Sequence, residues 1–312
     1  MCIHNKDILS DAKEDGSGAK ENIELEYGKG VFTLGIPGSG KTYVQKLLIH
    51  RLREKDPNVN VFIITPVSAS DYADLIRKHN GIIYTSPHLV NDYKPSVTVM
   101  EHCKERIPKQ ASGIFMQMDI GTESANLYEM FRNAWACFSA IREKMRENPD
   151  EKYAIAMDDT DMFLNETCQL PDFGYILLQI LEETASSKNC ALLLAGNWEK
   201  SVYTSYQFLN LVEEKNMDVL FRPITEEDVK AAKRCFHLRK NDLGLLCHDF
   251  RASANNSGLA VLLIEHRKGI LPGLRKTDVD LNVAPEEHKI CANSEYYREC
   301  YEDIMAAHRK DA

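Results

Sequence analysis

Long apolar runs are absent from this chain of 312 residues. The longest ones, such as residues 191–195 and 259–264, are far shorter than the roughly 20 residues that cross a bilayer as a helix. The first residues are polar and lack the apolar core of a secretory signal peptide. We therefore expect no transmembrane segment and a location in the cytoplasm, where only partner proteins would bring the chain to the inner face of the membrane.

Closely spaced cysteine pairs are absent as well. The nine cysteines are scattered and odd in number, and no C-x-x-C pair occurs. Cys291 and Cys300, with His288 nearby, form a loose cluster that lacks the spacing of a metal site. This pattern predicts reduced thiols in a cytosolic protein and argues against a disulfide framework or a cysteine-ligated zinc.

The chain has no excess of basic residues. It contains 38 Lys and Arg against 47 Asp and Glu, which gives a net charge of −9. This balance argues against a protein covered in nucleic acid, although a local basic channel remains compatible with it. The hydrophobic content of 44% and charged content of 27% are those of an ordinary globular protein, long enough for one large α/β domain or two small ones.

The most informative stretch that is present runs from Gly35 to Thr42 and matches G-x-x-x-x-G-K-[ST] at every fixed position. An apolar run precedes it, and apolar residues recur at helical spacing after it, which predicts a strand, a phosphate-binding loop and a helix. A chance glycine-rich turn is the alternative, and it does not account for this flanking pattern. The residues expected to bind nucleotide are Gly35, Pro37, Gly38, Ser39, Gly40, Lys41 and Thr42.

Each part of this loop has a physical task. Glycines allow successive backbone N–H groups to face an anion at the positive end of the following helix. Lys41 is expected to reach the β- and γ-phosphates, and the Thr42 hydroxyl to ligate Mg²⁺. The sequence therefore predicts binding of ATP together with Mg²⁺.

Two carboxylates end a later apolar run, Tyr153–Met157. In phosphate-loop ATPases the first acid after such a strand holds the Mg²⁺ shell and the second polarises the attacking water. Asp158 and Asp159 are the candidates for these two roles. The alternative is a turn or helix cap that leads into Thr160.

A second buried run, residues 190–196, ends at Asn197. If its carboxyl end lies beside the phosphate loop, Asn197 is placed to sense the γ-phosphate or to orient water. The pair Gly196-Asn197 is equally compatible with a simple turn. Both interpretations stay open at this stage.

Strand and helix patterns alternate along most of the chain, which predicts an α/β fold with a mainly parallel central sheet flanked by helices. Residues 1–27 are expected to form a flexible N-terminal segment, 28–285 the ATPase domain, and 286–312 a C-terminal tail helix. A helical insertion is expected at about 98–150, because apolar residues recur every three or four positions in its second half. Gly258–Glu265 and Ile270–Leu274 predict a C-terminal β-hairpin.

The order of these parts resembles the FtsK/HerA superfamily of P-loop ATPases, and most closely its conjugative branch, the ATPases of type IV secretion systems. The resemblance covers roughly residues 28–280. Beyond the loop it involves the segments ITPVSASDYADLIRKHNGIIY, YAIAMDD and SSKNCALLLAGN, and the region that begins MDVLFRPITEEDVKAAKRCFHL. It implies a RecA-like (ASCE) fold, a hexameric ring, and secretion-channel proteins or DNA as partners.

The resemblance also implies an arginine finger across the subunit interface, for which Arg222, Arg251 and Arg267 are candidates. Two positions depart from the family pattern. Asp159 stands where Glu is usual, and Asn197 follows Gly where Gln after Thr is usual. Both polar arms are shorter, so we expect slow turnover unless water bridges the gap. The large N-terminal domain of the closest family members is missing from this sequence.

These observations favour an oligomeric ATP hydrolase, with Lys41, Asp159 and Asn197 as catalytic residues, that drives DNA or protein transfer in conjugation or type IV secretion. The alternatives are an ATP-binding assembly switch with little hydrolysis and a stand-alone double-stranded DNA translocase. A GTPase is disfavoured because the Asn-Lys-x-Asp guanine signature is absent after the loop. A small-molecule kinase would not need the long C-terminal half.

Overall fold

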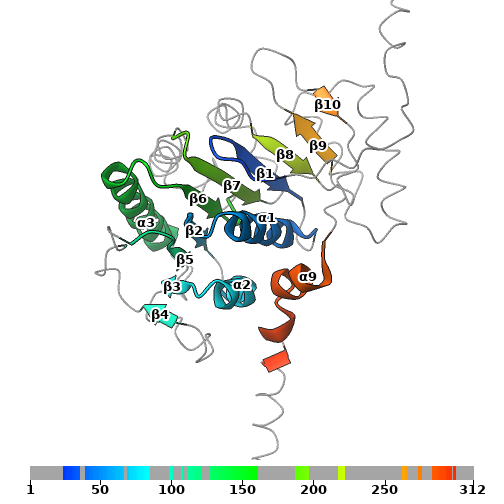
Figure 1. Cartoon of the computed structure of the whole chain (residues 1–312), viewed down its shortest axis with the longest axis horizontal. Helices are drawn as coiled ribbons and strands as arrows, with labels where there is room; N and C mark the ends of the chain where they lie inside the picture. The colour runs from blue at the N-terminus through cyan, green and yellow to red at the C-terminus, as the bar shows by residue number, and fades with distance from the viewer. Residues whose placement is uncertain are drawn as a thin grey trace, which may run out of the picture.

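The computed structural model describes residues 24–35, 39–66, 69–84, 98–100, 107, 111–120, 127–160, 187–196, 217–221, 262–265, 273–275, 283–296 and 298–299. In these residues ten strands form one sheet in the order β10-β9-β8-β1-β7-β6-β2-β5-β3-β4 (Figure 1). The strands are β1 (Gly30–Leu34), β2 (Asn60–Thr65), β3 (Ile82–Tyr84), β4 (Thr98–Met100), β5 (Phe115–Asp119), β6 (Tyr153–Met157), β7 (Cys190–Gly196), β8 (Asp218–Phe221), β9 (Leu262–Glu265) and β10 (Gly273–Arg275).

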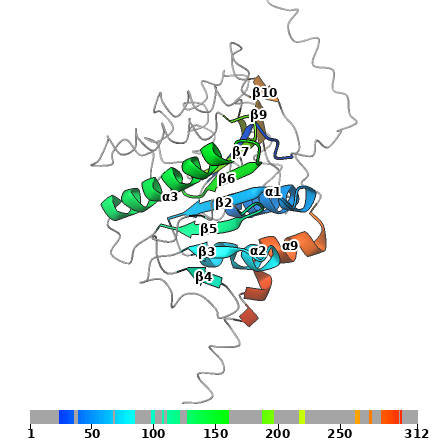
Figure 2. The same ribbon diagram turned by 60° about the vertical axis from the view of Figure 1, so that its left-hand side comes forward.

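Neighbouring strands from β8 to β4 are all parallel, and Figure 2 shows β7, β6, β2, β5, β3 and β4 following one another across the sheet. Strands β9 and β10 add the predicted antiparallel hairpin pair beside β8. Every residue of β2, β5, β6 and β7 is buried, because helices cover a parallel sheet on both faces. The predicted α/β class with a mainly parallel sheet is confirmed.

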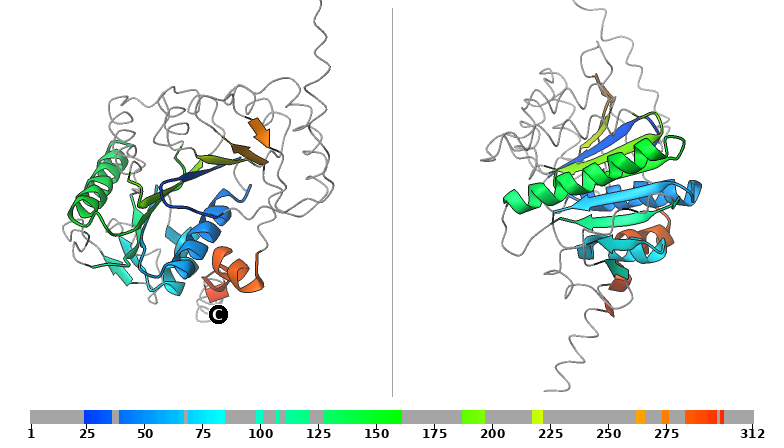
Figure 3. Two further views of the ribbon diagram at one scale, coloured as in Figure 1. Left: turned by 45° about the horizontal axis from the view of Figure 1, so that its top comes forward. Right: turned by 90° about the vertical axis from the view of Figure 1, so that its left-hand side faces the viewer.

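Helices cover the two faces of the sheet unequally. The short 3₁₀ helix η1 (Ala69–Tyr72) and helices α1 (Lys41–Lys55), α2 (Ala73–Lys78) and α9 (Pro285–Cys291) lie on one side, and α3 (Leu127–Glu147) lies on the other (Figure 3). Side chains of α1 and α2 form one buried cluster with residues of β1, β2, β5, β6 and β7. In the part of the chain that is described, no helix is both long and apolar enough to cross a bilayer.

The segment predicted as a helical insertion contributes more than a helix. Its helix is present as α3, but residues 98–100 and 115–119 are strands β4 and β5. Strand β5 lies between β2 and β3, so this segment belongs to the central sheet. The sequence analysis did not place these two strands.

The borders of the domain also differ from those expected. Residues 24–27 were assigned to a flexible segment, yet Leu25 is buried in the core cluster and the Tyr27 hydroxyl donates to Asp56 Oδ2 at 2.9 Å. At the other end, the first part of the tail helix predicted for residues 286–312 is present as α9, but a turn at residues 292–293 interrupts it. Helix α9 begins at Pro285 and its buried Cys291 joins the same cluster. The rest of the predicted tail helix, beyond residue 299, lies outside the described residues.

Helix α9 is attached to α1 by a two-point ion pair. Arg51 Nε and Nη2 donate to the two carboxylate oxygens of Glu287 at 2.8 and 2.9 Å. The residues that follow α9 are held by α2, because the Asp74 carboxylate accepts the backbone N–H groups of Glu295 and Tyr296. Segments more than 200 positions apart therefore pack directly against the helix that follows the phosphate loop.

Candidate nucleotide-binding site

The phosphate loop connects β1 to α1, as the sequence predicts. Gly40, the residue before α1, has a φ of +86°, a left-handed conformation that favours glycine. No side chain caps the amino end of α1, and its first turn contains no acidic residue. The first N–H groups of α1 and its positive dipole end are therefore suited to an anion such as phosphate.

The structure places Gly35, Ser39, Lys41 and Thr42 around this helix start. Gly35 is the residue after β1, Ser39 is buried, and Lys41 and Thr42 are the first two residues of α1. Pro37 and Gly38 lie outside the described residues. The described part of the loop thus brings the lysine and the hydroxyl of the motif to one helix end.

The phosphate loop and the acidic strand end meet directly. The Thr42 hydroxyl donates a hydrogen bond to Asp158 Oδ2 at 2.9 Å, although 116 positions separate the two residues. Asp158 follows β6, and only β7 lies between β6 and β1 in the sheet. Carboxyl ends of parallel strands share one edge of a sheet, which explains why this pair forms. The predicted association of Thr42 with Asp158 is thus seen in the geometry.

Asp158 is a buried carboxylate with several donors around it. It is 4% exposed, and it accepts hydrogen bonds from the hydroxyls of Thr42 and Tyr72 and from the Asp159 N–H at 3.0 Å. Burial raises the pKa of Asp158 above its ordinary value, and these hydrogen bonds offset only part of that rise. A cation beside this carboxylate would favour its charged form.

Tyr72 is a residue of this site that the sequence analysis missed. Its hydroxyl lies 2.9 Å from Asp158 Oδ2 and also contacts Oε1, the side-chain oxygen of Gln45. The Gln45 amide nitrogen in turn donates to the carbonyls of Met157 and Leu193, at 3.2 and 3.4 Å. Gln45 and Tyr72 are both fully buried. The available signal was a polar Gln45 on the apolar face of the predicted helix.

Lys46 joins α1 to the segment that carries Tyr72. This buried lysine donates to the Asp71 carbonyl, and its ammonium lies 5.8 Å from the centre of the Tyr72 ring. Burial lowers the pKa of Lys46. Helix α1 and η1 are thereby connected just behind the Thr42–Asp158 pair.

Asp159 adopts a left-handed backbone conformation with φ of +46°, which is uncommon for a residue other than glycine. The next residue, Thr160, donates through both its N–H and its hydroxyl to the Ala195 carbonyl at 2.9 Å. These bonds fix the turn after β6 against the end of β7. A strained backbone at such a position is common at functional sites.

The end of β7 also contacts the phosphate loop, since the Gly35 N–H donates to the Gly196 carbonyl at 3.4 Å. Asn197 is the next residue along the chain and lies outside the described residues. So do the three candidate fingers, Arg222, Arg251 and Arg267. The roles predicted for these four residues stay predictions.

Asp119 is another acid at the carboxyl edge of the sheet, and it was not predicted from the sequence. It ends β5 and is the register partner of Thr65 on β2, while the Asp158 N–H donates to the Ile64 carbonyl at 3.0 Å. Asp119 is 2% exposed. The sequence pattern that could have identified it is similar to that of Asp158, because a mostly apolar run, Phe115–Met118, ends in an acid.

The donor groups at this edge fit the ligands that the motif implies. Mg²⁺ prefers oxygen ligands, and Thr42 and Asp158 present a hydroxyl and a carboxylate oxygen side by side. The uncapped start of α1, with Lys41 as its first residue, fits the phosphates of a nucleotide. The residues present are therefore compatible with Mg²⁺ and ATP.

Replacing Tyr72 with phenylalanine is expected to lower the free energy of unfolding by about 1–3 kcal/mol, because buried Gln45 Oε1 loses the hydroxyl donor and Asp158 loses one of its three donors. Chemical denaturation of the purified protein measures this. Tyr43→Phe is the matched control, since that hydroxyl contacts His288 Nδ1 at the surface and its loss should have a smaller effect. Equal losses in the two variants would contradict the buried network.

No protein-family model matches the sequence, and no curated protein sequence matches it significantly. Among solved structures the chain is similar to VirB4 of Thermoanaerobacter pseudethanolicus, with 12% identity and a TM-score of 0.53 over 83% of this chain and 90% of that one. A weaker likeness is to the genome packaging NTPase B204 of Sulfolobus turreted icosahedral virus 2, with 9% identity and a TM-score of 0.44 over 76% of this chain and 91% of that one. Another is to the type VII secretion ATPase EccC of Thermomonospora curvata, with 12% identity and a TM-score of 0.35 over 64% of this chain and 20% of that one.

The likeness to VirB4 extends over most of both chains and concerns the fold. The resemblance drawn from the sequence motifs is confirmed at this level. The chain has an α/β P-loop NTPase fold similar to that of VirB4.

Proposed function

We propose that this protein is a Mg²⁺-dependent ATPase motor that works as a ring of identical subunits and powers transfer of DNA or protein, as in conjugation or type IV secretion. The observation that carries the proposal is the 2.9 Å hydrogen bond between the Thr42 hydroxyl and the Asp158 carboxylate. It supports the proposal because the hydroxyl and the carboxylate that would hold Mg²⁺ lie side by side. The VirB4-like fold supports the choice of a motor over other P-loop proteins.

In this proposal each residue has a defined role. The loop amides and Lys41 bind the phosphates, Thr42 and Asp158 hold the metal, and Asp159 orients the attacking water. Bound Mg²⁺ would neutralise charge that develops on the phosphates during hydrolysis. Asn197 would sense the γ-phosphate, and an arginine of a neighbouring subunit would complete the site.

The buried position of Asp158 suits this role. Its carboxylate is held by Thr42 and Tyr72 from two elements, α1 and η1, so it needs little rearrangement to meet a metal. The link from Asp158 through Tyr72 to η1 and α2 also gives the site a route by which nucleotide binding would move neighbouring helices. Such a connection is what a motor requires.

Steady-state ATP hydrolysis, with and without single- or double-stranded DNA at two salt concentrations, tests the proposal. We expect DNA to raise the rate and the rise to shrink as salt increases, because phosphate contacts release counterions. Heparin controls for a general response to polyanions. Hydrolysis without any response to DNA would favour protein transfer as the task, and tight ATP binding without hydrolysis would contradict a motor and favour an assembly switch.

A further inference from the structure

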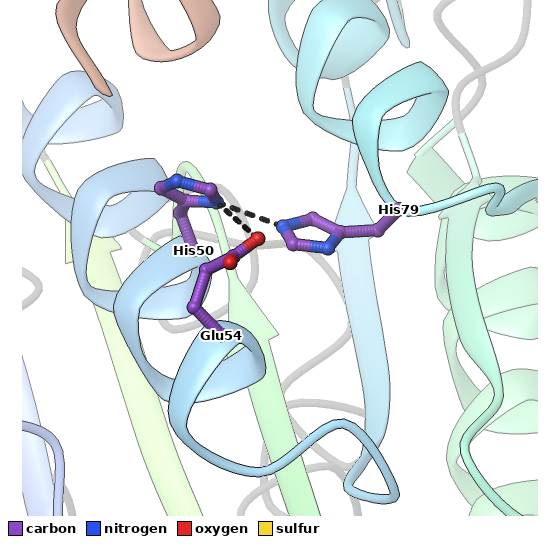
Figure 4. Close-up of side chains that lie close together, drawn as sticks. All are labelled: His50, Glu54 and His79. Atoms are coloured by element: carbon purple, nitrogen blue, oxygen red, sulfur yellow. Dashed lines mark hydrogen bonds and ion pairs between the residues drawn. The ribbon is translucent and has the colours of Figure 1, made fainter. Parts of the chain in front are cut away.

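Two histidines and a glutamate converge on the face of α1 that is turned toward α2. His50 and Glu54 are one helical turn apart on α1, and His79 is the C-cap residue that directly follows α2. His50 Nδ1 lies 2.9 Å from His79 Nε2 and 4.0 Å from Glu54 Oε1 (Figure 4). One ligand atom from each of the three lies within 4.8 Å of the others.

We propose that His50, Glu54 and His79 form a binding site for one zinc ion, with water as the fourth ligand. Two imidazole nitrogens and a carboxylate are donors that Zn²⁺ favours, whereas Mg²⁺ prefers a full set of oxygens. With Zn–N bonds of about 2.0–2.1 Å and a tetrahedral angle, two ligand nitrogens stand about 3.3 Å apart. The two histidine nitrogens need to separate by only a few tenths of an ångström to reach that distance.

The surroundings keep both rings in place. The His79 ring stacks on Phe115, with centroids 4.9 Å apart and an interplanar angle of 24°. Gly81 follows two residues later, and a Cβ there would lie 2.9 Å from the Phe115 ring. The His50 side chain is 7% exposed in the packed side of α1. The site is therefore pre-organised on two rigid helix segments.

The site is open on the side of Glu54, whose side chain is 55% exposed. A metal ion and a water ligand can enter there. His50 Nδ1 and His79 Nε2 share one hydrogen-bond proton, so the ring that carries it changes tautomer when both nitrogens bind the metal.

Three basic side chains near the proposed zinc site leave room for a metal ion. Lys78 lies 3.9 Å from Glu54 but is 47% exposed and can turn to solvent. Arg51 is engaged with Glu287, and Arg53 donates to the carbonyls of Val59 and Gly113.

A zinc ion here would connect α2 to α1. Helix α2 directly follows η1, whose Tyr72 contacts Asp158. The proposal does not depend on the proposed ATPase function, because metal binding can be measured without nucleotide.

Zinc titration of tag-free, chelator-treated protein against a coloured zinc indicator, without nucleotide, tests the site. We expect one tight equivalent in the wild type. In Glu54→Gln and His79→Gln its Kd should rise by about 100-fold or more, since even partners of metal ligands are worth 10–100-fold. His288→Gln, at an exposed histidine of α9, is the matched control and should bind as the wild type does.

Two further readouts separate this site from the cysteines. Saturating zinc should raise the melting temperature of the wild type and not that of Glu54→Gln, whose exposed side chain is not needed for folding. Cobalt bound in place of zinc should show no thiolate charge-transfer band. Unchanged tight binding in Glu54→Gln and His79→Gln, a thiolate band, or the absence of a tight equivalent would each overturn the proposal.

Discussion

Replacing Lys41 with alanine is expected to weaken ATP binding by on the order of 100-fold or more. Lys41 is the first residue of α1, at the helix end that the phosphates would approach. A hydrogen bond to a charged group is worth about 1.5–3 kcal/mol, and every ~1.4 kcal/mol is a factor of ten in affinity. Equilibrium titration with a fluorescent ATP analogue measures the change.

Lys29→Ala is the matched control for this experiment. Lys29 is also a lysine next to β1, but it is about half exposed and pairs with Glu26 at 2.6 Å on the surface. Its loss should leave ATP binding unchanged, since surface ion pairs contribute little. If Lys41→Ala bound ATP as tightly as the wild type, residues Gly35–Thr42 would not be a phosphate-binding loop.

Asp158→Asn should lower the rate of ATP hydrolysis by on the order of 10³-fold while it raises the thermal stability of the protein. The rate falls because a neutral amide neither holds Mg²⁺ well nor offsets its charge. Stability rises because Asn keeps an oxygen to accept from Thr42 and Tyr72 and removes a charge from a buried position, a gain that we expect to exceed the loss of the acceptor of the Asp159 N–H. Hydrolysis assays and melting curves on the same sample measure both.

The raised pKa of Asp158 predicts how the stability gained by Asp158→Asn depends on pH. Burial raises the pKa of Asp158 in the folded state above its value in the unfolded chain. When the pH is above both pKa values, the buried charge therefore lowers the free energy of unfolding. This loss disappears as the pH falls from the raised pKa of the folded state to the pKa of the unfolded chain. The stabilisation by Asp158→Asn should be full near neutral pH and should shrink in acid.

Asp56→Asn is the control of opposite sign. Burial of Asp56 acts to raise its pKa, but hydrogen bonds from Lys152 and Tyr27 outweigh it, so the pKa of Asp56 lies below its ordinary value. Its charge stabilises the fold above the unfolded pKa and less so in acid. Asp56→Asn should thus lower the melting temperature at neutral pH. If both variants were destabilised alike, the charge of Asp158 would not be a cost to the fold.

The parts of the site that the sequence predicts are those with a local pattern. The motif from Gly35 to Thr42 and the strand that ends at Asp158 each combine an apolar run with fixed polar positions, so their elements were placed correctly. Strand β5 was not, because its short run of apolar residues is interrupted by Gln117 and looks the same in a short strand and in a buried helix segment. Its insertion between β2 and β3 depends on pairing with distant residues.

Apart from the meeting of Thr42 and Asp158, the contacts between elements at the site were not predicted. Tyr72 and Gln45 are 27 positions apart, and nothing in their spacing indicates that they meet beside Asp158. His50 and His79 are 29 positions apart and match no metal-ligand pattern. The start of α9 was within the predicted tail helix, and Pro285 at its first position and Glu286 and Glu287 in its first turn are local signals for a helix there.

The attachment of α9 to α1 has a consequence for how this chain folds during synthesis. Arg51 and Glu287 are 236 positions apart, and contacts at such separation form slowly because a long loop must close first. Until residues 283–296 have left the ribosome, α1 lacks the cover that Glu287, Cys291 and Tyr296 provide around it and α2. The packing around the helix that carries Lys41 is therefore completed only after this C-terminal segment has been made.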